Sequence, residues 1–173
     1  KFIHMPWAFP NKQILLSRID LRNNDVVIFG AGKSDAYDIR NWCRSHKEIK
    51  SFDNSGVENK KMTDMEYFEW LRCFDAAVAA GSSDPKYDLV TPKYFEIPAS
   101  GTLLFGQKCK DLKDLGFEDR ANYISFNKFD IIEKIREYKN SPKKYMEIRR
   151  NGLEFIRDNH LISHRINKIK EVL

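Results

Sequence analysis

The sequence is poor in cysteine and has neither a long hydrophobic run nor a leader pattern at its start. Its three cysteines are far apart and lack C-x-x-C spacing (Cys43, Cys73 and Cys109). We expect them to be buried as small apolar residues in a reducing compartment, and we expect no structural metal site. No apolar run approaches the roughly 20 residues that a membrane-spanning helix needs, and no signal-peptide pattern follows Lys1. These absences predict a cytoplasmic protein without a transmembrane segment.

The charge balance is only mildly positive, with 30 Lys and Arg against 25 Asp and Glu and a net charge of +5. Such a balance favours either solubility or attraction to phosphates, nucleic acid or acidic lipid. Much of the excess lies near the C-terminus, on predicted helices where acidic residues separate the basic ones. Nucleic-acid patches cluster more tightly than this. We therefore expect a solvated helix face and no nucleic-acid partner, and the same interleaving argues against contact with an anionic membrane.

Short apolar runs alternate with helix-like segments from residue 25 onward. Strands are predicted at 25–29, 49–52, 74–80, 102–105 and 123–126. Helices are predicted at 36–46, 63–72, 91–100, 111–115, 129–139, 142–159 and 163–173. This alternation is typical of an α/β fold with a doubly wound parallel sheet. We expect a Rossmann-like sheet of about five strands followed by C-terminal helices.

Helix-start signals and one irregular segment complete the prediction of local structure. Thr63-Asp-Met-Glu66 is a capping-box pattern, and Thr91-Pro92 offers an N-cap followed by proline at the first helical position. Ser141 is the predicted cap of the helix at 142–159. Residues 1–10 contain prolines and aromatics without a clear period, which predicts a linker rather than a core element. His160 and His164 are expected to form a surface pair rather than a zinc site.

The first candidate binding segment is Phe29-Gly-Ala-Gly-Lys33, directly after a predicted strand. In such sheets, ligands bind outside the carboxyl ends of the strands. Gly30 and Gly32 allow close approach of the backbone to a ligand, and Lys33 has the charge to meet a phosphate. The segment lacks the third glycine of a dinucleotide fingerprint and the Gly-x4 spacing of a P-loop. A plain strand-to-helix turn is therefore favoured on spacing alone.

The second candidate segment runs from Thr91 to Gly101. A helix N-terminus supplies free amides and the positive end of a dipole, which together favour an anion. Lys93 in the first turn has the charge to pair with a diphosphate, and Glu96 one turn later is able to accept hydrogen bonds from a ribose diol. On spacing alone, a binding site and an exposed helix face that merely carries both residues are about equally favoured.

A family resemblance favours the functional interpretation. Lys93-Tyr-Phe-Glu-Ile-Pro-Ala-Ser-Gly-Thr-Leu-Leu resembles the R/K-x-F-E-x-x-A-x-G-x-x-L segment of group 1 glycosyltransferases. It is most similar to the branch related to spore-maturation, CgeB-like proteins. The resemblance continues through the predicted strand at 122–126, the helix at 131–135, the segment 150–156 and the tail from His160 to Arg165. It covers roughly residues 25 to 173, and its strength lies in the order and spacing of these motifs.

The resemblance implies the nucleotide-sugar-binding half of a GT-B-type enzyme. Glu96 would bind the ribose of a nucleoside diphosphate sugar, and Lys93 would hold the diphosphate and stabilise it as a leaving group. Further binding residues are implied in the turn of Thr91, Pro92 and Tyr94, in the turn of Gly30, Gly32 and Lys33, and near the base at 52–57. Ser100 and Gly101 would serve packing. Residues 1–24 would be a linker from a missing N-terminal half, and residues 25–173 the donor-binding domain.

The departures from the family pattern limit the implied chemistry. Asp88 stands eight residues before Glu96, where retaining members carry the first acid of an E-x7-E pair. A loop acid is favoured for Asp88, and contact with the sugar remains open. The acceptor-binding N-terminal domain is absent, so the glycan, protein or lipid acceptor would bind through that missing domain. Without H-E-x-x-H, D-x-D or a Cys/His cluster, we expect metal-independent transfer with no cofactor, from a UDP-linked donor rather than a GDP-linked one.

Two other functions compete with a transferase. A non-catalytic interaction module with a degenerate half-fold is favoured by the missing acceptor machinery and opposed by Lys93 and Glu96. A response-regulator-like domain would need an acidic cluster after the first strand, where this chain has Gly-Ala-Gly-Lys.

Overall fold

The computed structural model describes residues 5–15, 17–52 and 62–173. Its centre is a sheet of five strands in the order β2-β1-β3-β4-β5. The strands are β1 (Val26–Ile28), β2 (Lys50–Ser51), β3 (Ala76–Ala79), β4 (Leu103–Gln107) and β5 (Ile124–Phe126). Every pair is parallel, and the register places Ala77 of β3 beside Val27 on one side and Leu104 on the other. The predicted doubly wound parallel sheet is confirmed.

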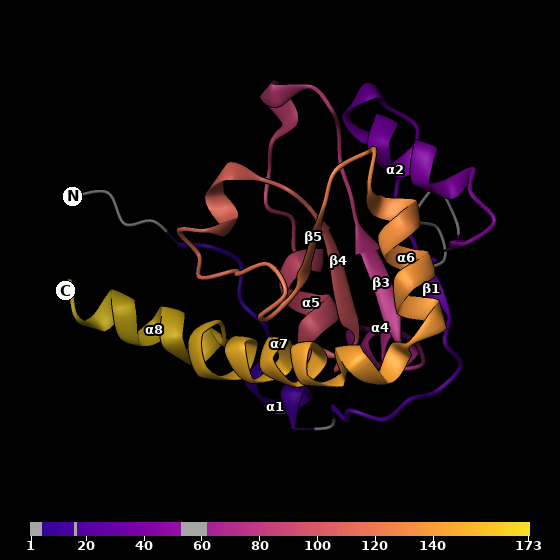
Figure 1. Cartoon of the computed structure of the whole chain (residues 1–173). Helices are drawn as coiled ribbons and strands as arrows, with labels where there is room; N and C mark the ends of the chain where they lie inside the picture. The colour runs from indigo at the N-terminus through magenta and orange to yellow at the C-terminus, as the bar shows by residue number, and fades with distance from the viewer. Residues whose placement is uncertain (1–4, 16, 53–61) are drawn as a thin grey trace.

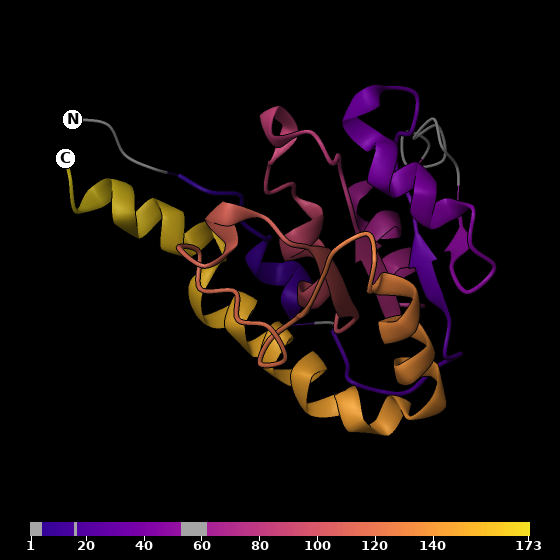
Figure 2. The ribbon, with the colours of Figure 1, turned by 45° about the horizontal axis from the view of Figure 1, so that its top comes forward.

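Helices cover both faces of this sheet (Figure 1). The described α-helices are α1 (Asn11–Ile14), α2 (Asp38–Arg44), α4 (Asp64–Leu71), α5 (Lys93–Ala99), α6 (Ile131–Asn140), α7 (Met146–Asn159) and α8 (Ile162–Lys170). Short 3₁₀ turns are η1 (Asp35–Tyr37), η2 (Pro85–Tyr87), η3 (Lys110–Leu112) and η4 (Pro142–Tyr145). The loop after β3 and the segment around α2 reach the top of Figure 1, and α7 lies at the opposite end. In both views α8 extends away from the sheet (Figure 2).

The alternation of side chains along each strand divides the core into two layers. Val27, Phe29 and Leu104 pack with α4, α5 and α7. Ile28 and Phe105, one residue out of phase, pack with α2 and α6. Because both faces are buried, strands β1, β3 and β5 consist of buried residues throughout. Strands β1 and β3 therefore appear as continuous apolar runs rather than as alternating patterns, whereas Ser125 interrupts β5.

Of the three helix starts predicted from capping signals, one is confirmed and two are wrong. The Thr63 hydroxyl and the Glu66 carboxylate form the expected capping box of α4. Thr91, however, does not cap α5: Pro92 occupies the N-cap position and α5 begins at Lys93. The Ser141 side chain also makes no capping hydrogen bond. Pro92 O accepts from the amides of Phe95 and Glu96, so proline sits one position earlier than its preference for the first helical residue suggests.

The segment predicted to lie outside the core contributes a buried aromatic residue. Phe9 is 1% exposed and belongs to the layer of α4 and α5. Its amide donates to His160 O at 2.8 Å, and its carbonyl accepts from Ile162 N at 3.0 Å. The prediction that residues 1–10 hold no core element is therefore wrong. Phe9 is a single buried residue, so its burial produces no periodic pattern in the sequence from which it could have been predicted. The division at residue 24 stays a prediction.

His160 is buried at the corner between α7 and α8, so the expected surface histidine pair is wrong. Its Nε2 lies 3.0 Å from Leu115 O, and its Nδ1 lies 2.6 Å from a guanidinium nitrogen of Arg165. Since the guanidinium is always a donor, Nδ1 of His160 accepts its hydrogen bond. Nε2 therefore carries the proton and donates a hydrogen bond to Leu115 O. Burial lowers the pKa of His160 to about 4, so the ring is neutral at neutral pH.

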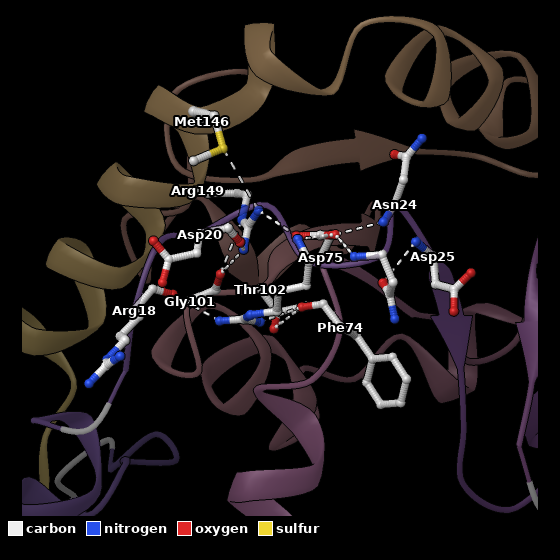
Figure 3. A network of polar contacts seen from close by, with 12 residues as sticks. Arg18, Asp20, Asn24, Asp25, Phe74, Asp75, Gly101, Thr102, Met146 and Arg149 are labelled. Carbon is white, nitrogen blue, oxygen red and sulfur yellow. Dashed lines mark hydrogen bonds and ion pairs between the residues drawn. The ribbon is translucent and has the colours of Figure 1, made fainter.

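A buried ion pair joins four parts of the chain at the amino ends of the strands (Figure 3). Asp75 and Arg149 have fully buried side chains, and Nη1 of Arg149 lies 2.9 Å from Oδ1 of Asp75. The Asp75 carboxylate also accepts the backbone amides of Arg22, Asn23 and Asn24. Arg149 donates as well to Gly101 O at 2.7 Å. The pair therefore holds the segment before β1, the start of β3, the turn before β4 and α7 together.

Gly101 marks the end of α5 and is expected to tolerate no side chain. Its φ is +70°, and a Cβ there would collide with the carbonyl of Arg18. Gly101→Ala is therefore expected to lower the free energy of unfolding by about 1–3 kcal/mol, the usual cost of a strained left-handed residue. Denaturant unfolding of Gly101→Ala and of Gly81→Ala, where an added Cβ meets no atom closer than 3.8 Å, tests this. Equal stability of the two variants would contradict the expectation.

Candidate functional site

The loops that follow β1 and β3 meet at one end of the sheet. Ligands of such sheets bind outside the carboxyl ends of the strands, where the strand order reverses, and here this point lies between β1 and β3. The loop after β1 contains Gly30 and Gly32, and the long loop after β3 leads to Lys93 at the start of α5. These two loops are in contact, because a Cβ added at Gly30 would lie 2.8 Å from Lys93 Nζ.

The glycine loop is held from behind by side chains of α2. Its three carbonyls each accept one hydrogen bond: Gly30 O from Arg44, Ala31 O from Arg40 at 2.7 Å and Gly32 O from Asn41 at 2.7 Å. Arg40 is 3% exposed and also donates to Ala80 O at 2.9 Å, so it ties this loop to the end of β3. Gly30 itself has a φ of +100°, a conformation that glycine adopts without strain.

Lys93 lies in a region with a surplus of positive charge. Its Nζ is 5.0 Å from the ring centroid of Phe29, a cation–π contact. Burial, together with the charges of Arg40 and Arg44, lowers the pKa of Lys93 to about 8, and the charge of Glu96 opposes this shift. Within the described ranges, no carboxylate lies close enough to Lys93 to form an ion pair. An anion that reached Lys93 would therefore be attracted by several cations at once.

Glu96 lies one turn along α5 and faces a hydroxyl from α4. The Tyr67 hydroxyl donates to Glu96 Oε2 at 2.8 Å. Burial raises the pKa of Glu96, and the hydrogen bond from Tyr67 and the charge of Lys93 oppose this shift. Lys93, Glu96, Pro92 and Tyr67 line one hollow of about 320 Å³, together with Met62 and Asp64. The two side chains singled out in the sequence thus share a concave surface.

The remaining predicted residues are not all at this hollow. Asp88 accepts from the amide of Lys110 at 3.4 Å, and with Thr91 and Tyr94 it lines a separate recess over β4. Tyr94 is buried, with its hydroxyl donating to Gln107 O at 2.7 Å and its amide to Thr91 O. Lys33 is exposed at the end of the glycine loop. The structure therefore places Lys93, Glu96, Pro92 and Gly30 together and Asp88 and Tyr94 apart from them.

Three side chains near this hollow were not among the predicted site residues. Arg40 and Arg44 are four residues apart on a helix, a spacing that places them on one face and that was visible in the sequence. Tyr67 carries no comparable signal, because its partner Glu96 lies 29 residues away. Of the segment expected near the base, Phe52 packs against Trp70, and residues 53–57 lie outside the described residues.

Comparison with known proteins places the chain in a family. The family model described as glycosyl transferase-like matches residues 12–171, and the search of curated proteins finds no match. Of the described helices, none is long and apolar enough to cross a membrane.

Several solved structures share the fold at low sequence identity. The C-terminal domain of the glycosyl transferase group 1 family protein LpcC from Francisella tularensis is 14% identical, with a TM-score of 0.63 over 89% of this chain and 99% of that domain. Sucrose-phosphate synthase from Thermosynechococcus elongatus is 10% identical, with a TM-score of 0.67 over 96% of this chain and 50% of that one. TarM is 12% identical, with a TM-score of 0.59 over 90% of this chain. The chain spans 36% of TarM, so it corresponds to part of that protein.

Proposed function

Because the chain belongs to the glycosyl transferase-like family and has the fold of a GT-B C-terminal domain, we propose that it binds a nucleoside diphosphate sugar as donor. The sugar would be transferred to a glycan, protein or lipid acceptor, which an N-terminal half outside this chain would bind. In this proposal Lys93 holds the diphosphate and Glu96 holds the ribose. A UDP-linked donor is favoured over a GDP-linked one, and a cytoplasmic location remains part of the proposal.

The observation that carries the proposal is the cationic surplus around Lys93. A partly buried ammonium group beside two arginines, with no ion pair to a carboxylate among the described residues, is unfavourable in the free protein, as the lowered pKa of Lys93 indicates. A diphosphate would replace this repulsion by attraction in a region of reduced dielectric, where charges interact more strongly than in water. A compact anion would therefore be attracted to the site.

The neighbouring hollow is suited to the rest of a nucleotide. Its volume of about 320 Å³ lies at the lower end of the range of small-molecule sites, about 300–1,000 Å³. Glu96 lies one helical turn from Lys93, so a ribose that contacts the carboxylate would have its diphosphate toward the ammonium. Pro92 lines this hollow and Gly30 lies beside Lys93, so both would contact the donor directly, and Gly32 would approach the donor as part of the same loop. Lys33 would approach the diphosphate from the exposed end of the glycine loop.

Lys93 would also be the catalytic group that this domain supplies. In glycosyl transfer, the bond between the anomeric carbon and the diphosphate oxygen breaks while an acceptor oxygen bonds to the same carbon. Negative charge then accumulates on the departing diphosphate. A positioned ammonium group stabilises that charge without reorganisation, the usual form of electrostatic catalysis. The proposal needs no metal for this step, and Asp88 and the Thr91–Tyr94 turn have at most a secondary role.

Titration of UDP, GDP and their common sugar conjugates into the chain tests this proposal. We expect one nucleotide to bind and to raise the melting temperature as its concentration exceeds the dissociation constant. Lys93→Ala and Glu96→Ala are each expected to weaken binding at least about tenfold, the loss of one charge-assisted contact. Calorimetry measures the affinity and thermal shift the stabilisation.

Lys143→Ala and Glu147→Ala are the matched controls, because both residues are exposed and lie at η4 and α7, the other end of the sheet. They are expected to bind like the unmodified chain. If no nucleotide binds, the donor function fails and a non-catalytic interaction module becomes the better description.

A further inference from the structure

Tyr67 makes a contact that the proposed donor site does not itself require. It lies on α4, and its hydroxyl donates to Oε2 of Glu96 at 2.8 Å. Burial raises the pKa of Tyr67, and the Glu96 charge raises it further, so the hydroxyl keeps its proton and remains a donor. No described residue donates to the other oxygen of Glu96, Oε1. Among the described residues, the carboxylate is therefore held at one oxygen only.

The position of the Tyr67 hydroxyl is set by packing and not by Glu96 alone. The Tyr67 ring is stacked on Trp70, with centroids 6.1 Å apart and planes at 25°. It meets Phe29 edge-on at 6.3 Å. The capping box at Thr63 fixes the start of α4 one turn earlier. A ring held on several sides keeps its rotamer, so the hydroxyl is in place before any ligand arrives.

We propose that Tyr67 is a positioning residue that aims Glu96 at the 2′,3′-diol of a ribose and so makes the site select ribonucleotides over 2′-deoxyribonucleotides. This inference rests on the proposed donor function. An ionised carboxylate has lone pairs for several donors. Tyr67 occupies one oxygen and leaves Oε1 for the sugar hydroxyls, in the hollow that Glu96, Tyr67 and Lys93 line.

Selection follows from the cost of an unpaired polar group. A site built to accept a hydrogen bond from a hydroxyl rejects an analogue without it, because the partner is then left unsatisfied. A glutamate that is free to rotate would avoid this cost by turning toward water. A glutamate held by Tyr67 is unable to turn away, and it also loses less rotamer freedom on binding.

A purely structural role for Tyr67 leads to a different result. If the hydrogen bond only joined α4 to α5, removing the hydroxyl would weaken all nucleotides equally through lower stability. The ratio of the two affinities, for ribose and for 2′-deoxyribose, would then stay the same. That ratio is therefore the informative quantity.

Calorimetric titration of UDP against 2′-deoxy-UDP, and of GDP against 2′-deoxy-GDP, measures this ratio for the unmodified chain and for Tyr67→Phe. Tyr145→Phe is the matched control. Tyr145 is also buried and its hydroxyl also faces a glutamate, Glu137, but it packs in the layer of α2 and α6. Should Tyr67→Phe fail to fold, Tyr67→Met repeats the test with a flexible side chain of similar apolar character.

We expect the unmodified chain and Tyr145→Phe to prefer the ribose form by about tenfold or more, the effect of one hydrogen bond to a charged group. In Tyr67→Phe the preference is expected to fall close to one. An unmodified chain that binds both forms equally, or a Tyr67→Phe variant that keeps the preference, would overturn the inference while leaving donor binding intact. If no nucleotide binds at all, the proposed donor function is overturned, and the inference about Tyr67 is overturned with it.

Discussion

Lys93→Met is expected to melt at a higher temperature than the unmodified protein at neutral pH while losing its affinity for nucleoside diphosphates. The ammonium group is desolvated and lies beside Arg40 and Arg44, and its pKa of about 8 indicates that the charged form is disfavoured. A methionine fills a similar volume without this charge. The expected gain is on the order of 2 kcal/mol, since each pKa unit corresponds to about 1.4 kcal/mol and the contacts with Phe29 and Glu96 are lost.

The pH dependence of stability separates this cause from simple packing. The folded pKa of Lys93, about 8, lies below the ordinary value of about 10.4 in the unfolded chain. Between these values the unfolded state binds more protons, so stability contributed by this residue rises with pH. Below pH 8 the full cost is present. The unmodified chain should therefore gain stability between about pH 8 and 10, and Lys93→Met should lack this gain.

Nucleotide affinity should change in the opposite direction. Because only the charged ammonium attracts a diphosphate, affinity should begin to fall as pH rises through about 8. Thermal unfolding and calorimetry across this pH range measure both effects, with Lys143→Met as the control for an exposed lysine. A Lys93→Met variant that is less stable at pH 7, or that follows the pH dependence of the unmodified chain, would contradict this explanation.

Arg149→Met is expected to cause the largest loss of stability, about 3–5 kcal/mol, because breaking a fully buried ion pair leaves an uncompensated charge. Asp75 would keep its amide donors from residues 22–24 but would lose its counter-charge. Gly101 O would lose the Arg149 donors as well. Urea unfolding measures the change in the free energy of unfolding.

Arg150→Met is the matched control, because Arg150 is the next residue of α7 and is exposed; its stability should stay within about 0.5 kcal/mol. A second comparison uses the double variant Asp75→Asn/Arg149→Met. Removing the remaining charge should make its loss smaller than the sum of the two single losses. An Arg149→Met variant as stable as Arg150→Met would show that the pair contributes little.

Local patterns were enough to predict the five strands and the helices α2 and α4 to α8, but not α1. The strands at β1, β3 and β4 are apolar runs ended by glycine or polar residues, and the capping box of α4 involves two residues only three positions apart. Such signals are formed by residues that are close in the sequence, so they are recognised without knowledge of the fold. Lys93 and Glu96 lie one turn apart on one helix, and their spacing in the sequence already predicted that they act as a pair.

Positions that depend on distant partners were decided by the tertiary structure. Asp75 meets Arg149 across 74 residues of sequence, and Tyr67 meets Glu96 across 29. Nothing in the spacing of such pairs distinguishes them from other acids, arginines and tyrosines. Phe9 and His160 were misplaced for the same reason, since their burial arises from packing between the N-terminal segment and the corner of α7 and α8.

The sequence by itself thus determined the class of fold, the family and the segment that carries Lys93 and Glu96, because each of these is encoded in contiguous residues. The tertiary structure alone decided which groups surround that segment. It brought Arg40 and Arg44 to Lys93, placed Tyr67 on Glu96 and separated Asp88 and Tyr94 from both. The physical reason is that charge, burial and hydrogen bonding act through space, over distances that the order of residues does not record.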